Sequence, residues 1–318
     1  MPAGVAREKR VVPVVLDTDI GTDIDDTWAL AMVLRCPELD PRLVVTASGD
    51  TTYRARIAAG ILAAGGRSDV PLAIGIPSGG NPGAPQQRFA SEVELAQHQG
   101  SVRSDGVAAM IECIASSTEP VTLVSIGPAT NVASALAAEP GIADNARFVG
   151  MHGSIRVGYR GKGPPVPEYN VRTDVAAFRA VIAAPWEVTI TPLDTCGSVV
   201  LSGARYAAVR EGNDSLLGAV LRNYREWLEA VGRPELYSDR TTPLFDTVAV
   251  YLAYAEDLVE IEHLPIAVRD DGMTQVAPGG HQVRVATRWH DAERFADHLL
   301  ARLTYDQGDT RWPYSPRE

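Results

Sequence analysis

Five aspartates crowd into ten residues near the start of the chain, directly after a short apolar run. The segment reads Val14-Val15-Leu16-Asp17-Thr18-Asp19-Ile20-Gly21-Thr22-Asp23-Ile24-Asp25-Asp26. Carboxylates at this density repel one another, and a helix N-terminus offsets only about 0.3–1 kcal/mol per acid. A hard cation such as Ca²⁺ relieves far more, because it takes roughly 6–8 oxygen ligands. Gly21 permits the sharp turn that brings the acids to one point, so the loop predicts a cation site.

Two other interpretations of the acidic loop stay open. The aspartates could be helix-capping residues of a solvated loop that binds nothing. Alternatively, Asp17-Thr18-Asp19-Ile20-Gly21 resembles the DxDx(T/V) motif of haloacid-dehalogenase-type phosphatases, although Gly21 stands where those proteins have Thr or Val. That hypothesis makes Asp17 a nucleophile and Mg²⁺ the cofactor. The order of the acids does not fit an EF-hand.

A carboxylate and an amide occur together later in the chain, after a loop rich in Gly and Pro. Glu168 and Asn170 are two residues apart, so an extended backbone would point both to the same side. Together they can accept and donate hydrogen bonds, which suits sugar hydroxyls. The pair indicates a sugar site if the other motifs lie nearby, and solvated loop residues otherwise.

A lone acid stands in an apolar helical segment near residue 246. Thr242 is a natural N-cap and Pro243 a natural first helical residue, so Asp246 is expected in the first turns, beside Phe245 and other apolar residues. A buried carboxylate needs a partner. A cation and an arginine are equally good candidates from the sequence alone.

The elements that must position these residues alternate along the chain. Apolar runs predict strands over Val11–Leu16, Leu43–Ala47, Leu72–Ile74, Val121–Ile126, Arg147–Met151 and Val188–Thr191. Ala- and Leu-rich stretches predict helices over Asp26–Arg35, Tyr53–Ala64, Gly106–Ser116, Ala129–Ala138 and Val175–Ile182.

This alternation predicts an α/β fold with a doubly wound, mostly parallel central sheet flanked by helices. Residues 203–255 are expected to be mainly helical, 257–268 and 281–286 to be late strands, and Asp291 to cap a last helix that ends near Leu303. We expect a single domain over 1–318, with a flexible N-terminus over 1–10. Ligands of such sheets lie at the carboxyl ends of the strands.

Composition excludes several classes of function. The 318 residues carry a net charge of −11 and a pI near 5.1, which argues against nucleic-acid binding. No apolar run reaches the roughly 18 residues of a membrane helix, and the N-terminus does not resemble a signal peptide. Three scattered cysteines suit a reducing cytoplasm, so we expect a cytoplasmic protein with neither nucleic-acid nor membrane partners.

Taken together, the motifs resemble the nucleoside hydrolase family, the inosine–uridine-preferring ribohydrolases, from Val14 to about Leu303. The acidic loop is similar to the DTDPGxDD signature of that family. The other matching segments, in order, are Ser48–Asp50, Gly127–Asn131, Met151, Glu168-x-Asn170 and Asp246. The resemblance implies the nucleoside hydrolase fold and Ca²⁺-dependent hydrolysis of the N-glycosidic bond of a ribonucleoside, giving ribose and free base.

The resemblance also implies roles for individual residues. The Ca²⁺ ligands would be the carboxylates of Asp19, Asp26 and Asp246 and the backbone carbonyl of Thr130. Substrate would contact Asp25, Asp50, Met151, Glu168, Asn170 and Phe245. Of these, Asp25 and Asn170 would bind ribose hydroxyls, and Glu168 the 5′ end. Related glycoside hydrolysis passes through an oxocarbenium-like state, and Asp19 would be the general base that activates a metal-bound water.

Three departures from the family pattern leave questions open. The acidic loop is two residues longer than usual, so Asp23 could take the role given to Asp25. Asp50 stands where the common pattern has Asn. Phe245 replaces a His that is a candidate proton donor to the leaving base; Phe can only stack on a base. Weak candidates for the missing donor are His152, Tyr237, Arg240 and Cys196.

A non-catalytic nucleoside- or ribose-binding protein is therefore an alternative to the enzyme. The loops at 75–88, 152–167 and 231–241 are expected to shape the base pocket, but the base is not predicted. The resemblance further suggests a homodimer or a homotetramer.

Overall fold

A ten-stranded sheet runs through the protein, in the order β4-β3-β2-β1-β5-β6-β7-β10-β8-β9. The computed structural model describes residues 11–77 and 83–305. The strands are β1 Val12–Thr18, β2 Leu39–Thr46, β3 Leu72–Ile74, β4 Val102–Arg103, β5 Val121–Ser125, β6 Ala146–Met151, β7 Val188–Thr191, β8 Val259–Val268, β9 Thr274–Val276 and β10 His281–Trp289. Strands β1–β7 pair in parallel, β10 joins β7 in parallel, and β8 and β9 are antiparallel.

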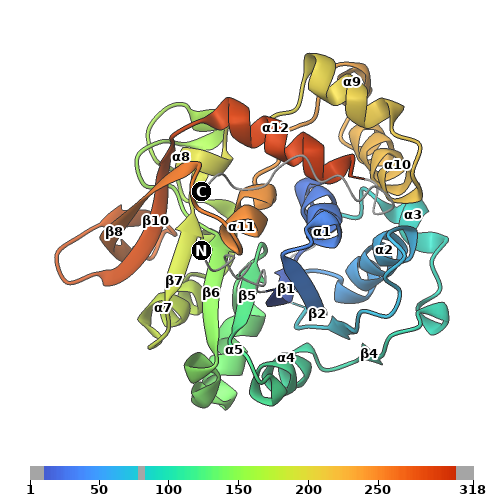
Figure 1. Ribbon diagram of the computed structural model, residues 1–318. Helices are drawn as coiled ribbons and strands as arrows, with labels where there is room; N and C mark the ends of the chain where they lie inside the picture. Colours follow the sequence, from blue (N-terminus) through green and yellow to red (C-terminus); the bar gives the residue numbers. More distant parts are fainter. Residues whose placement is uncertain (1–10, 78–82, 306–318) are drawn as a thin grey trace, which may run out of the picture.

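Helices cover both faces of this sheet (Figure 1). They are α1 Asp25–Arg35, α2 Thr51–Ala64, α3 Gln87–Ser91, α4 Gly106–Ser116, α5 Thr130–Ala138, α6 Tyr169–Thr173, α7 Val175–Ala183, α8 Leu193–Cys196, α9 Gly203–Glu211, α10 Ser215–Ala230, α11 Asp246–Leu252 and α12 Ala292–Leu303. Short 3₁₀ helices are η1 Leu95–Gln97, η2 Pro140–Asp144, η3 Tyr159–Gly161 and η4 Pro234–Ser238. The predicted α/β fold with a doubly wound, mostly parallel sheet is confirmed.

Successive residues of β1 enter two separate cores, which explains why the central strands are apolar throughout. Val14 and Leu16 pack with helices α1, α2, α10, α11 and α12 on one face. Val15 packs with α4, α5 and α7 on the other face. Because helices cover both faces, a polar side chain in the middle of such a strand would be buried. Polar residues are therefore expected mainly at the strand ends.

Several helices begin at a side-chain cap that is visible in the sequence. The carboxylate of Asp291 accepts a hydrogen bond from the Arg294 amide, so the predicted cap of α12 is confirmed. The prediction for Thr242 and Pro243 is wrong, because α11 begins only at Asp246 and its N-cap, Phe245, provides no side-chain bond. Leu244 is held instead through its amide by the Val199 carbonyl, which keeps 242–245 out of the helix.

The strand limits differ from prediction where polar residues interrupt an apolar run. β2 begins at Leu39 instead of Leu43. Pro41 pairs with Val14 and Leu43 pairs with Val15, so Arg42 between them is an unpaired residue at a shift in register. The short strands β4 and β9 carry too few residues to show an alternation and were not predicted.

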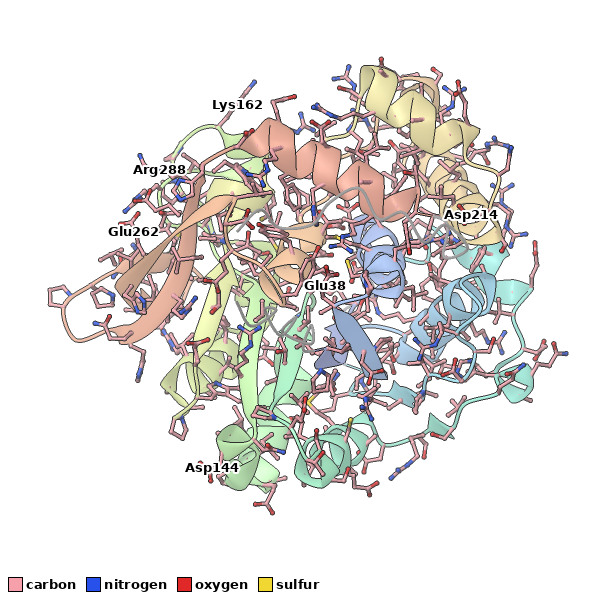
Figure 2. The ribbon with its side chains drawn as sticks, in the orientation of Figure 1. Glu38, Asp144, Lys162, Asp214, Glu262 and Arg288 are labelled. Atoms are coloured by element: carbon pink, nitrogen blue, oxygen red, sulfur yellow. The ribbon has the colours of Figure 1, made fainter. Side chains whose placement is uncertain are left out.

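Charged side chains such as Asp144, Lys162, Glu262 and Arg288 project from the periphery of the molecule (Figure 2). Within 11–77 and 83–305, no helix has both the length and the apolar character required to cross a bilayer. The predicted N-terminal segment 1–10 lies outside the described residues, and the single domain stays a prediction.

Candidate active site

A pocket opens where the carboxyl ends of β1, β5 and β6 meet at one edge of the sheet. β1 lies between β2 and β5, so the chain departs to opposite sides there; ligands of α/β sheets bind at such switch points. The pocket has a volume of about 200 Å³. Its described lining comes from the loop after β1, from Ile126, Met151 and the segment around η3 and α6, and from the start of α11.

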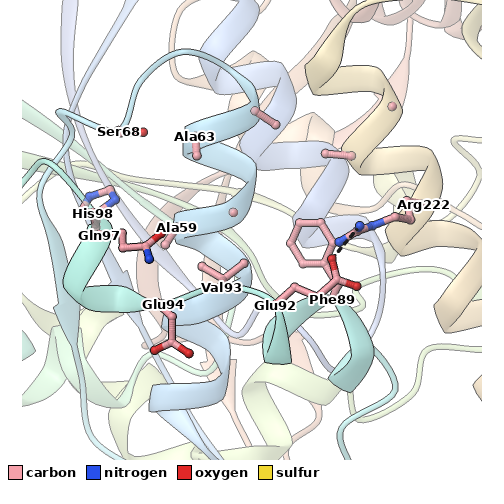
Figure 3. Close-up of a pocket in the computed structure, with 14 residues that line it drawn as sticks. Ala59, Ala63, Ser68, Phe89, Glu92, Val93, Glu94, Gln97, His98 and Arg222 are labelled. Carbon is pink, nitrogen blue, oxygen red and sulfur yellow. Dashed lines mark ion pairs between the residues drawn. The ribbon is translucent and has the colours of Figure 1, made fainter.

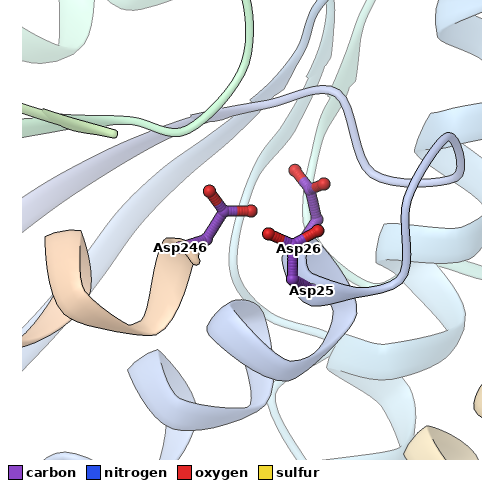
Figure 4. A group of neighbouring side chains, drawn as sticks. All are labelled: Asp25, Asp26 and Asp246. Carbon is purple, nitrogen blue, oxygen red and sulfur yellow. The ribbon is translucent and has the colours of Figure 1, made fainter. Parts of the chain in front are cut away.

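Three buried carboxylates face one another in this pocket (Figure 4). Asp25 and Asp26 open α1, Asp246 opens α11, and one oxygen from each lies within 4.8 Å of the others. Neither helix has a side-chain N-cap. All three acids therefore lie in the first turn of a helix that has no side-chain cap, where the partial positive charge of a helix N-terminus favours a carboxylate.

Burial raises the pKa of all three carboxyls well above its usual value, and repulsion between neighbouring carboxylates raises it further. A hydrogen bond from the Thr18 hydroxyl to Asp26 partly opposes this. Within the described residues, no arginine or lysine forms an ion pair with Asp25, Asp26 or Asp246. Buried oxygen donors without a counter-charge fit a hard divalent cation.

Asp19 and Asp23 add two carboxylates to the pocket wall. Asp19 packs against Gly127 so closely that a Cβ there would lie 3.0 Å from its Oδ1. Burial raises the pKa of Asp19 to about 6, while the charge of Arg54 opposes the shift. Asp23 accepts a hydrogen bond from the Ile24 amide at 2.7 Å and is only partly buried. Both Asp23 and Asp25 thus reach the site, and Asp25 belongs to the tight cluster.

Arg54 lies beneath the acidic loop and is only 1% exposed. Its guanidinium donates to the backbone carbonyls of Asp19, Ile20 and Ser48 and to the Thr22 hydroxyl. Sequence reasoning missed this residue. A signal was present, because Arg54 shares one helix face with Ile57, Ala58 and Ile61, positions that predict a buried side.

Glu168 and Asn170 also line the pocket, although the predicted extended backbone is wrong. Glu168 is the N-cap of α6 and its two oxygens accept bonds from the amides of Gly153, Asn170 and Val171. Burial raises the pKa of Glu168 to about 7 against the effect of these bonds. The side-chain amide of Asn170 donates to the carbonyls of Ile126 and Met151. A helical turn, not strand alternation, brings the pair together.

Two predicted site residues lie away from the described lining. Thr130 is the first residue of α5, so its carbonyl points along the helix, and its hydroxyl donates to Asp174 at 2.8 Å. Asp50 is exposed and caps α2 by accepting bonds from the Thr52 and Tyr53 amides. Ile126, four residues before Thr130, lines the pocket instead.

Aromatic rings form the wall beside Asp246. Phe245 and Tyr159 stand at 88° with their centroids 6.1 Å apart, and Tyr169 lies next to them in the lining. The Tyr159 hydroxyl accepts a bond from the Tyr169 amide, and burial raises the pKa of Tyr159 to about 12. Of the three loops expected to shape the base pocket, 152–167 contributes Tyr159 to the described lining, and residues 78–82 of the loop 75–88 lie outside the described residues.

None of the four candidate proton donors is among the described lining residues. His152 is fully buried, its ring stacks on Phe178 at 4.7 Å, and burial lowers its pKa to about 3. Cys196 is buried, with its thiol pKa raised by burial. Arg240 is exposed and pairs with Asp239, while the Tyr237 hydroxyl accepts from an arginine.

Asp17 is buried inside β1 and does not face the pocket. Its carboxylate accepts bonds from the Asn131 amide at 2.8 Å and from the Ser125 hydroxyl, and burial raises its pKa to about 7. A nucleophile must reach its substrate. This geometry therefore removes the basis for a phosphatase with Asp17 as nucleophile.

A larger hollow of about 530 Å³ lies elsewhere, between α2, α3, η1 and α10 (Figure 3). Six of its fourteen described lining residues are Ala or Gly, and Arg222 forms an ion pair with Glu92 at 2.8 Å. Arg222 also stacks on Phe89. Among the described residues, its lining includes none of the predicted site residues and no cluster of carboxylates suited to a metal, so the pocket at the strand ends is the better candidate despite its smaller size.

Comparison with known proteins gives one consistent family. Residues 14–297 match the sequence model described as inosine-uridine preferring nucleoside hydrolase. A non-specific ribonucleoside hydrolase RihC from Klebsiella pneumoniae is 31% identical over 228 residues, which cover 67% of this chain and 72% of that protein. RihC from Salmonella schwarzengrund is 31% identical over 67% of this chain and 71% of its own length.

Solved structures share the architecture at lower identity. A plant nucleoside hydrolase, PpNRh1, superposes with a TM-score of 0.78 at 20% identity, covering 93% of this chain and 99% of that one. A purine-preferring ribonucleoside hydrolase from Gardnerella vaginalis gives 0.75 at 21% identity, covering 92% and 98%. These two likenesses establish the fold.

Proposed function

The chain belongs to the inosine-uridine preferring nucleoside hydrolase family, and from this premise we propose that it is an N-glycosyl hydrolase that cleaves ribonucleosides to ribose and free base. The observation that carries the proposal is the cluster of Asp25, Asp26 and Asp246 at the switch point of the sheet. Buried carboxylates without an arginine or lysine partner reduce the stability of the folded protein, and a bound metal ion that takes part in the reaction would compensate for this loss.

We assign Ca²⁺ as the cation, held by the carboxylates of Asp19, Asp26 and Asp246. For the backbone carbonyl we favour Ile126 over Thr130, because Ile126 follows β5 directly and lines the pocket. When bound, the cation would lower the pKa of a water molecule and hold it for attack.

Ribose would lie between Asp25 and the Glu168–Asn170 pair. The Asn170 amide nitrogen is already used by the carbonyls of Ile126 and Met151. Its amide oxygen has no donor within the described residues, so it can accept from a sugar hydroxyl. Glu168, fixed by three backbone amides, can accept from the 5′ hydroxyl, and Met151 packs against the sugar.

The carboxylates also suit the transition state. As the C1′–N bond breaks, positive charge grows on the ribose ring, and fixed negative charges around it lower the barrier. Asp19 accepts the proton of the attacking water, whose oxygen forms the new bond to C1′. The electron pair of the broken bond leaves with the base.

The test is turnover of a panel of ribonucleosides by metal-depleted and Ca²⁺-restored protein, with reducing sugar and free base measured together. We expect Ca²⁺-dependent release of both in equal amounts. Absence of release, with Ca²⁺ and nucleosides still raising the melting temperature, would replace the hydrolase with the nucleoside-binding alternative.

A second experiment separates the roles of neighbouring acids. Luminescence of bound Tb³⁺, displaced by Ca²⁺, reports affinity without turnover. Asp26→Asn should weaken Ca²⁺ binding by at least about tenfold more than Asp25→Asn, since each 1.4 kcal/mol of lost ligation is tenfold. The reverse order would exchange the two assignments. The cytoplasmic location and the homodimer or homotetramer stay predictions of the sequence.

A further inference from the structure

When all are ionised, the carboxyl groups of the pocket carry more negative charge than one divalent cation balances. Within the described lining there is no lysine, arginine or histidine. The acids that face the pocket are Asp19, Asp23, Asp25, Asp26, Glu168 and Asp246. A divalent cation offsets two of these six formal charges, and the buried Arg54 beneath the loop offsets one more. A positively charged ligand would find the remaining field favourable.

Among the acids of the described lining, Asp23 is the one to which the proposed function gives no role. It lies outside the cluster of Asp25, Asp26 and Asp246 and is only partly buried. Its backbone is fixed because the Asp23 carbonyl accepts from the Gln86 side chain and the Thr22 carbonyl accepts from the Trp227 indole. The carboxylate is therefore held in the pocket wall.

Apart from its carboxyl groups, the described lining offers no side chain that donates a proton readily at neutral pH. Besides the carboxyl groups, its O–H groups belong to Thr22, Tyr159 and Tyr169. Both carboxylate oxygens of Glu168 already accept bonds from backbone amides, so neither is directed toward a leaving base as a proton donor. The base of a neutral nucleoside leaves as an anion and needs a proton, a step for which general acids contribute roughly 10²–10⁴-fold.

Flat aromatic surface stands beside the acids. Phe245 directly precedes Asp246, and its ring meets Tyr159 edge-to-face at 6.1 Å. Aromatic faces attract cations, so this wall suits a flat ring that carries positive charge.

From the excess of carboxylates, the position of Asp23, the lack of a proton donor and the aromatic wall, we propose that the preferred substrates are ribonucleosides whose base is cationic, such as N-ribosylated pyridinium rings and N7-alkylated purines. This substrate class rests on the proposed hydrolase function. Water oxygen bonds to C1′, and the C1′–N bond breaks. Its electron pair neutralises the charge on nitrogen, so the base leaves neutral without being protonated. The proton of the water passes to Asp19 and then to solvent.

The kinetic test compares 7-methylguanosine with guanosine, which differ by one methyl group and one charge. In the Ca²⁺-loaded enzyme, kcat/KM should be at least about 100-fold higher for 7-methylguanosine, the lower end of what a missing general acid costs. Phe245→His supplies an imidazole beside the base. This variant should raise kcat/KM for guanosine by about tenfold or more. The ratio of kcat/KM for 7-methylguanosine to that for guanosine should therefore become smaller.

A binding test removes the intrinsic reactivity of cationic nucleosides from the comparison. The Ca²⁺-loaded enzyme should bind 1-methylnicotinamide at least about tenfold more tightly than neutral nicotinamide, measured by calorimetry. Asp23→Asn should bring the two dissociation constants together. Glu94→Gln removes one charge at the rim of the larger hollow and should leave their ratio as it is.

Equal kcat/KM for the two nucleosides, or equal dissociation constants for the two pyridines, would overturn the preference for cationic substrates. In both cases ribose release from guanosine would still support the hydrolase. If neither nucleoside releases ribose at any Ca²⁺ concentration, the proposed function itself fails, and the substrate class with it.

Discussion

Replacing Arg54 by methionine tests whether the acidic loop is held from beneath. Methionine keeps much of the length of the side chain and removes its charge and all its N–H donors. Three buried carbonyls, those of Asp19, Ile20 and Ser48, then lose a donor. Because Arg54 is 1% exposed, water cannot replace the guanidinium without opening the loop.

The expected loss of stability follows from those three acceptors. A buried polar group left without a partner costs about 1–3 kcal/mol, so Arg54→Met should lower the free energy of unfolding by at least about 3 kcal/mol. Urea unfolding in EDTA measures it. Tb³⁺ luminescence should also show weaker binding of Ca²⁺, because Asp19 and the start of the loop are no longer fixed.

Two further variants make the result interpretable. Arg54→Lys keeps the charge but cannot reach all the carbonyls, and should fall between the parent and Arg54→Met in both measurements. Arg156 pairs with Glu262 at the surface and is half exposed, so Arg156→Met should change stability by less than about 1 kcal/mol. The reasoning is refuted if Arg54→Met stays within about 1 kcal/mol of the parent and binds Ca²⁺ equally well.

Further predictions concern the proposed general base Asp19, the glycine that packs against it, and the dependence of stability on pH. At saturating Ca²⁺, Asp19→Asn should lower kcat for ribose release by roughly 10²–10⁴-fold, while its melting temperature in EDTA should not fall below that of the parent; kcat close to the parent's would exclude Asp19 as the general base. In Gly127→Ala the new Cβ would lie 2.8 Å from the Asp19 amide and 3.0 Å from its Oδ1. We expect a destabilisation of about 1–3 kcal/mol and a lower kcat, and the idea fails if both are unchanged. Burial raises the pKa values of Asp17 and Glu168 to about 7, from 3.8 and 4.5. In EDTA the native state therefore binds more protons than the unfolded state from about pH 4 to 7, and the free energy of unfolding should fall as pH rises through this window. Urea unfolding at several pH values should show a smaller fall for Asp17→Asn, and a rise with pH in the parent would contradict the argument. At 100 times its dissociation constant, Ca²⁺ should restore about 2.7 kcal/mol.

The fold could be predicted because its signals are local. Strands buried on both faces must be apolar along their whole length, and Val121–Ile126 and Val188–Thr191 were found on that basis. Observed limits differ most where a polar residue enters a strand, as at Pro41 and Arg42 of β2. The N-cap at Asp291 is equally local, whereas the start of α11 depends on Val199, which is distant in sequence.

The sequence predicts a site residue only where the order of strands, loops and helices along the chain determines the position of that residue in the fold. The acids of the loop were predicted as site residues because the loop joins the end of β1 to the start of α1, and these two elements determine where the acids lie. Asp50 was assigned to substrate because Ser48–Asp50 resembles a segment of the family, yet its carboxylate caps the next helix. Neither Tyr159 nor Arg54 belongs to a recognisable motif. The position of Tyr159 depends on the path of a long loop, and that of Arg54 on how its helix packs beneath the acids.

The way Arg54 contacts the loop explains why the acids remain available for a ligand. A guanidinium that paired with carboxylates would satisfy their oxygens and compete with any cation. Here the guanidinium of Arg54 donates to backbone carbonyls and one hydroxyl instead. Its charge still lowers the pKa of Asp19 and Asp26. The carboxylate oxygens of Asp26 and Asp246 are thus held in place but not neutralised by the protein, which leaves their neutralisation to a bound cation.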